Sequence, residues 1–81
     1  METRVAVMSV IVEDFSAVDS LNKILHDYRD YIIGRMGLPY LKKNVNLISI
    51  ALDAPQDIIS ALSGKVGNIK GISVKIAMSG V

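Results

Sequence analysis

Hydrophobic residues along this chain alternate between strand-like and helix-like patterns. The run from Val5 to Val12 is apolar at both alternating sets of positions and rich in β-branched residues, which predicts a strand buried on both sides. Glu13 and Asp14 interrupt the run, and either Asp14 or Ser16 is placed to cap a following helix. The apolar stripe of that helix consists of Val18, Leu21, Ile24, Leu25 and Tyr28.

Two further strands are predicted in the middle of the chain. One runs from Tyr31 to Gly37 and the next from Val45 to Asp53. Proline, tyrosine and two lysines between them indicate a turn or hairpin loop over Leu38 to Asn44. In the third strand, Ile48, Ile50 and Leu52 fall on one face and Leu47, Ser49 and Ala51 on the other.

A second helix and a last strand complete the pattern. Asp53 to Pro55 begins the helix, with proline in the first turn, where its missing N–H costs nothing. The helix ends at Gly64 or Gly67, and the sequence favours neither. After a turn at Gly71, apolar and polar residues alternate over 72–79, which predicts a half-exposed strand.

The order strand, helix, strand, strand, helix, strand predicts an α+β, ferredoxin-like βαββαβ sandwich over a single domain, residues 1–81. Right-handed crossovers give a four-stranded antiparallel sheet with two helices on one face and the first and third strands in the middle. The open face would carry Val5, Val7, Ile11, Leu47 and Ala51. An apolar face exposed to water favours association with another molecule, so we expect a homo-oligomer, either a dimer or a tetramer.

Composition narrows the function classes. The chain has 81 residues, 51% of them hydrophobic, so one small core cannot bury all of its apolar surface. Without cysteine, thiol catalysis, cysteine–zinc sites and iron–sulfur ligation are excluded. A net charge of +1 with no basic cluster argues against direct nucleic-acid binding. We find no secretion signal and no apolar run long enough for a membrane helix, and expect a cytoplasmic protein.

The segment from Gly34 to Gly37, followed by Tyr40, is the most unusual part of the predicted strands. Two glycines weaken a strand, so they indicate a β-bulge or the close approach of a ligand or a neighbouring backbone. Arg35 between them suits bidentate recognition of a carboxylate or phosphate, the alternative being an exposed arginine paired with a nearby acid. We take Gly34, Arg35, Met36, Gly37 and Tyr40 as candidates for a ligand site or a subunit interface.

Other segments do not predict catalysis. His26 is the single histidine and has no second ligand in helical register, so we interpret it as a surface histidine, with metal binding across a subunit interface as the alternative. Ser63-Gly64-Lys65 lacks the full spacing of a phosphate-binding loop, so we interpret it as the C-terminus of a helix. We therefore expect no catalytic residues, no metal and no cofactor.

Several blocks, which together span essentially the whole chain, resemble one family. These blocks are Arg4-Val5-Ala6-Val7, Val12-Glu13-Asp14, Ile24 to Tyr28, Asp30 to Tyr40, Leu52 to Pro55 and Ile59 to Lys65. They are similar to the small regulators named "iron-only hydrogenase system regulator", and the Gly-Arg-Met-Gly block is the most specific part. That family is similar to ACT domains and to the C-terminal domain of the nickel-responsive repressor. The resemblance implies an ACT-like fold and a role as a regulator of transcription or of a hydrogenase system.

The chain departs from both of these similar groups. ACT domains typically bind amino acids at a glycine in the loop between the first strand and first helix, where this chain has Glu13-Asp14-Phe15-Ser16. The nickel-responsive repressor uses histidines and a cysteine for its metal, and carries a separate DNA-binding domain. This chain has one histidine and no cysteine, so if it regulates transcription we expect it to act through a partner or through a surface that the sequence does not reveal.

Three function classes follow from these observations. The first is an ACT-like regulatory module that forms a homo-oligomer and binds a small anionic ligand near Arg35. The second is a structural or adaptor protein in which Arg35 makes an ion pair between subunits. The third is an enzyme similar to acylphosphatases, which the acidic Glu13-Asp14-Phe15-Ser16 loop disfavours because it would repel phosphate. We expect a protein that is not an enzyme.

Overall fold

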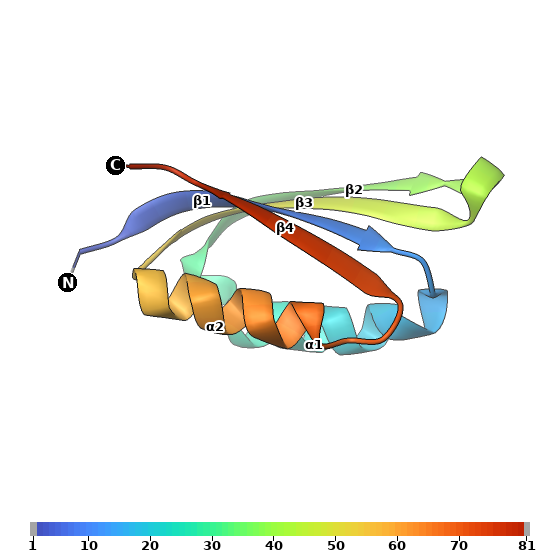
Figure 1. Ribbon diagram of the computed structural model, residues 1–81, viewed down its shortest axis with the longest axis horizontal. Helices are drawn as coiled ribbons and strands as arrows, with labels where there is room; N and C mark the ends of the chain where they lie inside the picture. Colours follow the sequence, from blue (N-terminus) through green and yellow to red (C-terminus); the bar gives the residue numbers. More distant parts are fainter. Residues whose placement is uncertain (1, 81) are drawn as a thin grey trace.

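Four strands and two helices form two layers in the computed structural model, which describes residues 2–80 (Figure 1). The strands are β1 (Arg4–Val12), β2 (Ile32–Tyr40), β3 (Val45–Ala54) and β4 (Ile72–Met78), and the helices are α1 (Val18–Asp27) and α2 (Gln56–Gly67). Neighbouring strands are antiparallel, in the order β2-β3-β1-β4, and both helices cover the same face of the sheet. The predicted ferredoxin-like sandwich, with the first and third strands in the middle, is confirmed.

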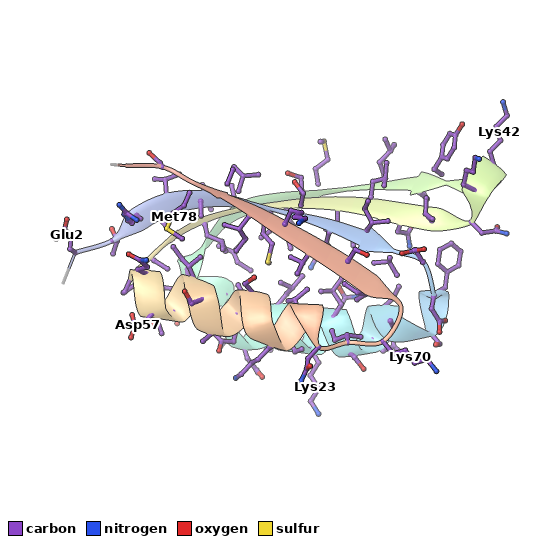
Figure 2. All side chains as sticks on the ribbon, in the orientation of Figure 1. Glu2, Lys23, Lys42, Asp57, Lys70 and Met78 are labelled. Atoms are coloured by element: carbon purple, nitrogen blue, oxygen red, sulfur yellow. The ribbon has the colours of Figure 1, made fainter. Side chains whose placement is uncertain are left out.

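The hydrophobic core lies between the sheet and the helices. Even-numbered residues of β1 and β3 point toward the helices because side chains alternate along a strand. The largest fully buried side chains are Met8, Val10, Val12, Leu21, Leu25, Ile50, Leu52, Ile59, Leu62 and Val66. Figure 2 shows side chains filling the space between the two layers. Over residues 2–80, neither helix is long and apolar enough to cross a bilayer.

Strand β1 is buried on one side only within a single chain. Val5, Val7 and Ile11 point away from the helices and are 39%, 41% and 42% exposed. The prediction of a strand buried on both sides is therefore wrong for the isolated chain. The physical reason is that two helices on one face leave the other face of the central strands uncovered.

Strand β2 starts one residue later than predicted and continues to Tyr40, so the predicted loop over Leu38 to Asn44 is too long. Only a 3₁₀ turn, Leu41–Lys43, and Asn44 separate β2 from β3. Pro39 is tolerated within the strand because β2 lies at the sheet edge, where a missing N–H costs no ladder bond. Asn44 adopts the left-handed conformation, with φ of 54°, which asparagine accepts more readily than most residues.

A β-bulge near the start of β2 sets the direction of the side chains that follow. Ile32 pairs with Leu52 of β3, but Gly34 rather than Ile33 pairs with the next residue, Ala51. This extra residue confirms the bulge that the two glycines indicated. A one-residue shift of register moves every later side chain to the opposite face. Because of the bulge, Arg35 faces the helix side of the sheet rather than the open side.

Asp14, one of the two candidates for the helix cap, caps the short 3₁₀ turn before α1 and not α1 itself, whose N-cap residue Ala17 makes no side-chain hydrogen bond. The Asp14 carboxylate accepts hydrogen bonds from the backbone N–H of Ser16 at 3.0 Å and from the Ser16 hydroxyl at 2.7 Å. This holds a 3₁₀ turn, Phe15–Ala17, which leads directly into α1. The Ser16 hydrogen bonds, with the charge of Lys70 as a smaller cause, lower the pKa of Asp14 below its ordinary value.

The second helix begins after the predicted Asp53 to Pro55, since Asp53 and Ala54 still belong to β3, and it ends at one of the two predicted glycines. Its first residue is Gln56, with Pro55 at the capping position, and it runs through Gly64 to Gly67, which resolves the choice between the two glycines. Gly71 then turns the chain into β4 with φ of 86°. A side chain there would place its Cβ 2.5 Å from the Cβ of Asp14, so only glycine fits between the two loops.

The β2–β3 hairpin projects past the helices at the end of the molecule where Lys42 lies (Figures 1 and 2). The overhang contributes to an elongated shape of 41 × 18 × 17 Å. Leu41, at the start of the hairpin turn, is 77% exposed. The hairpin therefore carries apolar surface that no helix of the same chain covers.

Candidate functional site

The five candidate residues of β2 do not gather in one place. Pairing with β3 puts Gly34, Met36 and Tyr40 on the open face, opposite Ala51, Ser49 and Val45. Arg35 and Gly37 pair with the core residues Ile50 and Ile48, so they lie on the helix side. The segment thus contributes to two surfaces on opposite sides of the sheet.

The first surface is the open face of the sheet. All five residues predicted for it lie there: Val5, Val7, Ile11, Leu47 and Ala51. Met36 and Leu38 of β2 extend the same surface and are 69% and 59% exposed. Sequence reasoning missed Leu38 because it was assigned to a loop, although the alternation of Met36, Leu38 and Tyr40 was a signal for a longer strand. Whether this face binds another subunit stays a prediction.

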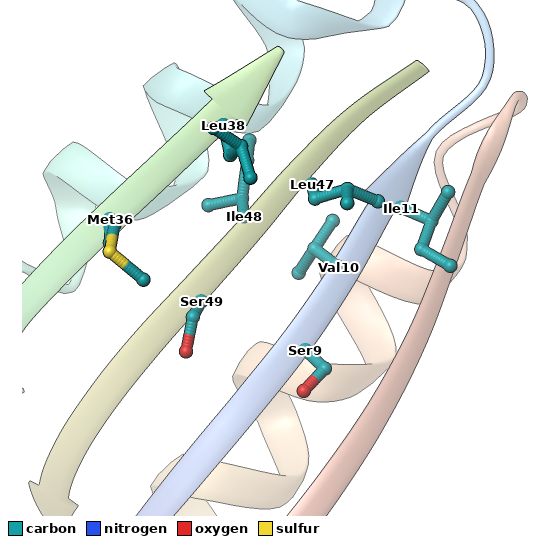
Figure 3. Close-up of a pocket in the computed structure, with 8 residues that line it drawn as sticks. All are labelled: Ser9, Val10, Ile11, Met36, Leu38, Leu47, Ile48 and Ser49. Atoms are coloured by element: carbon teal, nitrogen blue, oxygen red, sulfur yellow. The ribbon is translucent and has the colours of Figure 1, made fainter. Parts of the chain in front are cut away.

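A shallow groove of about 320 Å³ crosses the open face (Figure 3). Met36 and Leu38 line it from β2, Leu47 and Ser49 from β3, and Ser9 and Ile11 from β1. In Figure 3 the helices lie behind the sheet, so the groove opens away from them. Its lining is mostly aliphatic, with two serine hydroxyls at one end. Such a lining offers an apolar contact surface and no group for acid–base chemistry.

A small hollow adjoins this groove at the glycine end of β2. It is lined by Gly34, Arg35, Met36, Ser49 and Ala51. A Cβ built on Gly34 would meet no heavy atom within 4 Å, and the same is true of Gly37. Packing within the chain therefore does not require glycine at either position. The interpretation that the glycines admit a neighbouring molecule stays a prediction.

The second surface is a polar groove of about 340 Å³ on the helix side, between α1 and β2. Asn22, Leu25 and His26 line it from α1, Arg29 from the 3₁₀ turn Arg29–Tyr31, and Ile32 and Arg35 from β2. The Arg35 guanidinium donates to Asn22 Oδ1 at 3.1 Å, and Arg29 donates to the carbonyl of His26 at 2.9 Å. Arg35 is thus held by an amide, not by the nearby acid of the alternative interpretation.

The first strand–helix loop has the opposite character. Its Glu13 and Asp14 side chains are exposed, and Glu13 accepts a long hydrogen bond of 3.5 Å from the Ser73 hydroxyl. The negative charge here repels phosphate rather than cradling it. Within residues 2–80, no three His, Asp or Glu side chains come together as a metal site. The structure thus has two candidate binding surfaces, one apolar and one basic.

Comparison with known proteins identifies close relatives. A family model described as "TM1266-like: Iron-only hydrogenase system regulator, putative" matches residues 4–76. The solved structure of the uncharacterized protein TM1266 from Thermotoga maritima superposes with a TM-score of 0.91 at 33% sequence identity. That match covers 95% of this chain and 98% of TM1266. The comparison with curated proteins found no match.

A more distant solved structure shares the fold alone. It is a formyltetrahydrofolate deformylase from Pseudomonas putida KT2440, with a TM-score of 0.63 and 13% identity. The match covers 90% of this chain but only 28% of the deformylase. An activity that belongs to the larger protein is therefore not carried over.

Proposed function

This chain belongs to the TM1266-like family of iron-only hydrogenase system regulators, and on that premise we propose that it is a regulatory module that acts as a homo-oligomer. The subunits associate through the open face of the sheet, and the module responds to a small anionic ligand. It acts on transcription or on a hydrogenase system through a partner and catalyses no reaction itself. Its proposed location is the cytoplasm, since a cysteine-free chain suits a reducing compartment.

The observation that carries the proposal is the largely apolar surface across β2, β3 and β1, which only the paired Ser9 and Ser49 interrupt. Four large side chains of the two central strands, Val5, Val7, Ile11 and Leu47, are 38–42% exposed there, and Met36 and Leu38 continue the patch to the edge. Contiguous apolar patches of this kind mark interaction sites in soluble proteins. On β4, Ser73 and Lys75 border the patch and supply the polar rim that an interface usually has.

A second copy of the chain is the occupant that this face suits best. The molecule measures 41 by 18 Å in its two longest directions, so one face is comparable to the ~800 Å² that each partner buries in a standard interface. The open-face positions of the four strands carry one acid, Asp53, and one base, Lys75. In a two-fold arrangement that brings Asp53 of one copy beside Lys75 of the other, the reciprocal pair forms as well, because both copies use the same patch.

The test is the mass of the protein in solution. Light scattering should give a mass of two or more protomers of 8.8 kDa for the wild type. Val7→Lys or Leu47→Lys should reduce it to one protomer, because a lysine at the centre of the patch must otherwise lose its hydration in the interface. Ala61→Lys adds the same charge on the exposed side of α2 and should leave the mass unchanged.

Circular dichroism on the same samples shows whether each variant is folded. A wild-type protein that is monomeric at all accessible concentrations would contradict the proposed assembly, as would lysine variants that keep the wild-type mass. The regulatory part is tested separately, by deleting the gene and measuring transcripts of the hydrogenase genes. Unchanged transcript levels under hydrogenase-inducing conditions would count against it.

A further inference from the structure

The groove between α1 and β2 combines an apolar floor with a basic rim. Leu25, 2% exposed, and the half-buried Ile32 form the floor. Asn22, His26, Arg29 and Arg35 surround it with polar groups. None of the six lining residues is acidic. Two guanidinium groups therefore border one small concave site without a carboxylate in its lining.

Two local features bring the arginines to the same groove. Asn22, His26 and Arg29 recur at spacings of four and three, so they follow one face of α1 and its extension. Arg35 joins them only because of the bulge at Ile33, since a regular β2 would turn it to the open face. The bulge lets Ile32 and Arg35, three residues apart, face the same groove.

The arginines retain donors for a ligand. A guanidinium has five N–H donors. The structure uses one from Arg35, toward Asn22 Oδ1, and one from Arg29, toward the His26 carbonyl. Among residues 2–80, neither guanidinium makes an ion pair with a carboxylate. Each hydrogen bond orients its arginine while leaving most of its donors and its full charge available.

From this geometry we propose that the α1–β2 groove binds a small dianion, carried by a phosphate group or by two carboxylates. Arg35 and Arg29 supply two positive charges and directional N–H donors, which suit planar carboxylates and phosphate oxygens. The Asn22 amide and the His26 ring supply further polar contacts at the rim. A groove of about 340 Å³ is at the small end of ligand pockets, which limits the ligand to a compact metabolite.

This inference rests on the proposed function only in one respect, the response of the module to a small anion. The site is complete within one chain and does not need a second subunit. This site is also not the one at which ACT domains bind amino acids, which corresponds to the loop around Glu13 and Asp14. Binding and assembly are tested independently, because binding is measured from NMR shifts of residues in α1 and β2 and assembly is measured from the mass in solution.

The experiment is a titration of the ¹⁵N-labelled full chain, followed by NMR. Inorganic phosphate and succinate are added separately at constant ionic strength, with sodium chloride as the control for non-specific screening. Saturable shifts of the amides of Asn22, Ile32 and Arg35 are expected with at least one dianion. Saturation by phosphate alone indicates a ligand with a phosphate group, and saturation by succinate alone indicates a ligand with two carboxylates.

Matched variants decide whether the groove is the site. Arg35→Ala should weaken binding about tenfold or more, since a charge-assisted contact is worth roughly 1.5–3 kcal/mol. Lys42→Ala removes one positive charge at the distant hairpin tip and should leave the affinity unchanged (Figure 2). Non-saturating shifts equal to those of chloride, or equal affinities of wild type and Arg35→Ala, would overturn the proposal. Light scattering on the same samples keeps a failure of assembly distinct from a failure of binding.

Discussion

Arg35 and Met36 are neighbours in the sequence but serve opposite sides of the sheet. Arg35 contacts Asn22 on the helix side, whereas Met36 lies beside the open-face groove. The sequence identified this segment as unusual and indicated a bulge, but it could not place the extra residue at Ile33. The register of β2 is set by its pairing with β3, a contact that depends on the bulge and on the whole length of both strands. The sequence alone therefore could not show which face of the sheet each of these side chains lies on.

The two glycines of β2 can be told apart by substitution. Gly34→Val should fill the hollow beside Ser49 and Ala51 on the open face and dissociate the oligomer. Gly37→Val is the matched control, because Gly37 lies on the helix side and its added Cβ also meets no atom within 4 Å. Both variants should fold, with stability equal to or above the wild type by up to about 1 kcal/mol, since valine favours strands.

Mass by light scattering and urea unfolding check this pair. A Gly34→Val protein with the wild-type mass would show that the hollow is not part of the interface. Loss of folding in either variant would contradict the open space that surrounds both positions.

At the scale of elements, periodicity predicted the central strands better than the edges. Alternation of apolar residues placed β1 and β3 correctly because both are long and buried on their helix side. β2 was predicted too short, since Leu38, Pro39 and Tyr40 have the composition of a loop. An edge strand tolerates proline, so composition alone does not end it. The helix cap was predicted less well, because Asp14 caps the 3₁₀ turn before α1 and not α1 itself, whose N-cap residue is Ala17.

The connection between β1 and α1 should weaken in acid. The pKa of Asp14 is lower in the folded chain, chiefly through the Ser16 hydroxyl and backbone N–H. A carboxyl of this kind stabilises the fold above its unfolded pKa, and that contribution is lost as pH falls through the lower, folded value. The free energy of unfolding should therefore decrease below about pH 4, the ordinary range of aspartate.

Asp14→Asn keeps an oxygen acceptor for the Ser16 donors but does not titrate. Its urea midpoint should change less than that of the wild type between neutral and acidic pH. Asp57→Asn, on α2, is the control that makes the same change of side chain elsewhere and keeps Asp14, so its midpoint should still fall in acid. Identical acid dependence of the wild type and Asp14→Asn would refute this role of the carboxylate.

The whole molecule has one covered and one uncovered sheet face. The sequence predicted this arrangement from element order alone, because two βαβ units with right-handed crossovers put both helices on the same side. It also predicted five apolar residues of the uncovered face, although it missed Leu38. The polar α1–β2 groove could not be predicted, since it joins the face of a helix to a strand whose direction depends on a bulge. Residues 22, 26, 29 and 35 share no motif in the sequence.

Thermal stability should depend on protein concentration if the open face is an interface. For a dimer that unfolds to single chains, each tenfold increase in concentration adds about 1.4 kcal/mol to the stability of the dimer. The corresponding rise in Tm is roughly 3–5 °C for a two-chain unit of this size. Calorimetry of wild type and Val7→Lys over a concentration series checks this. A wild-type Tm that is independent of concentration would argue for a monomer.

Successive side chains of β2 point to opposite faces of the sheet. They line the α1–β2 groove on the helix side and the apolar surface on the open side. A displacement of the β2 backbone would therefore move side chains at both surfaces. Thermodynamic reciprocity then imposes a strict rule. If the dianion favours the assembled state by a given coupling free energy, assembly must tighten the dianion by the same amount. If both proposals hold, a one-residue irregularity in an edge strand would link the two sites, and the dianion concentration and the subunit concentration would each change the affinity measured for the other.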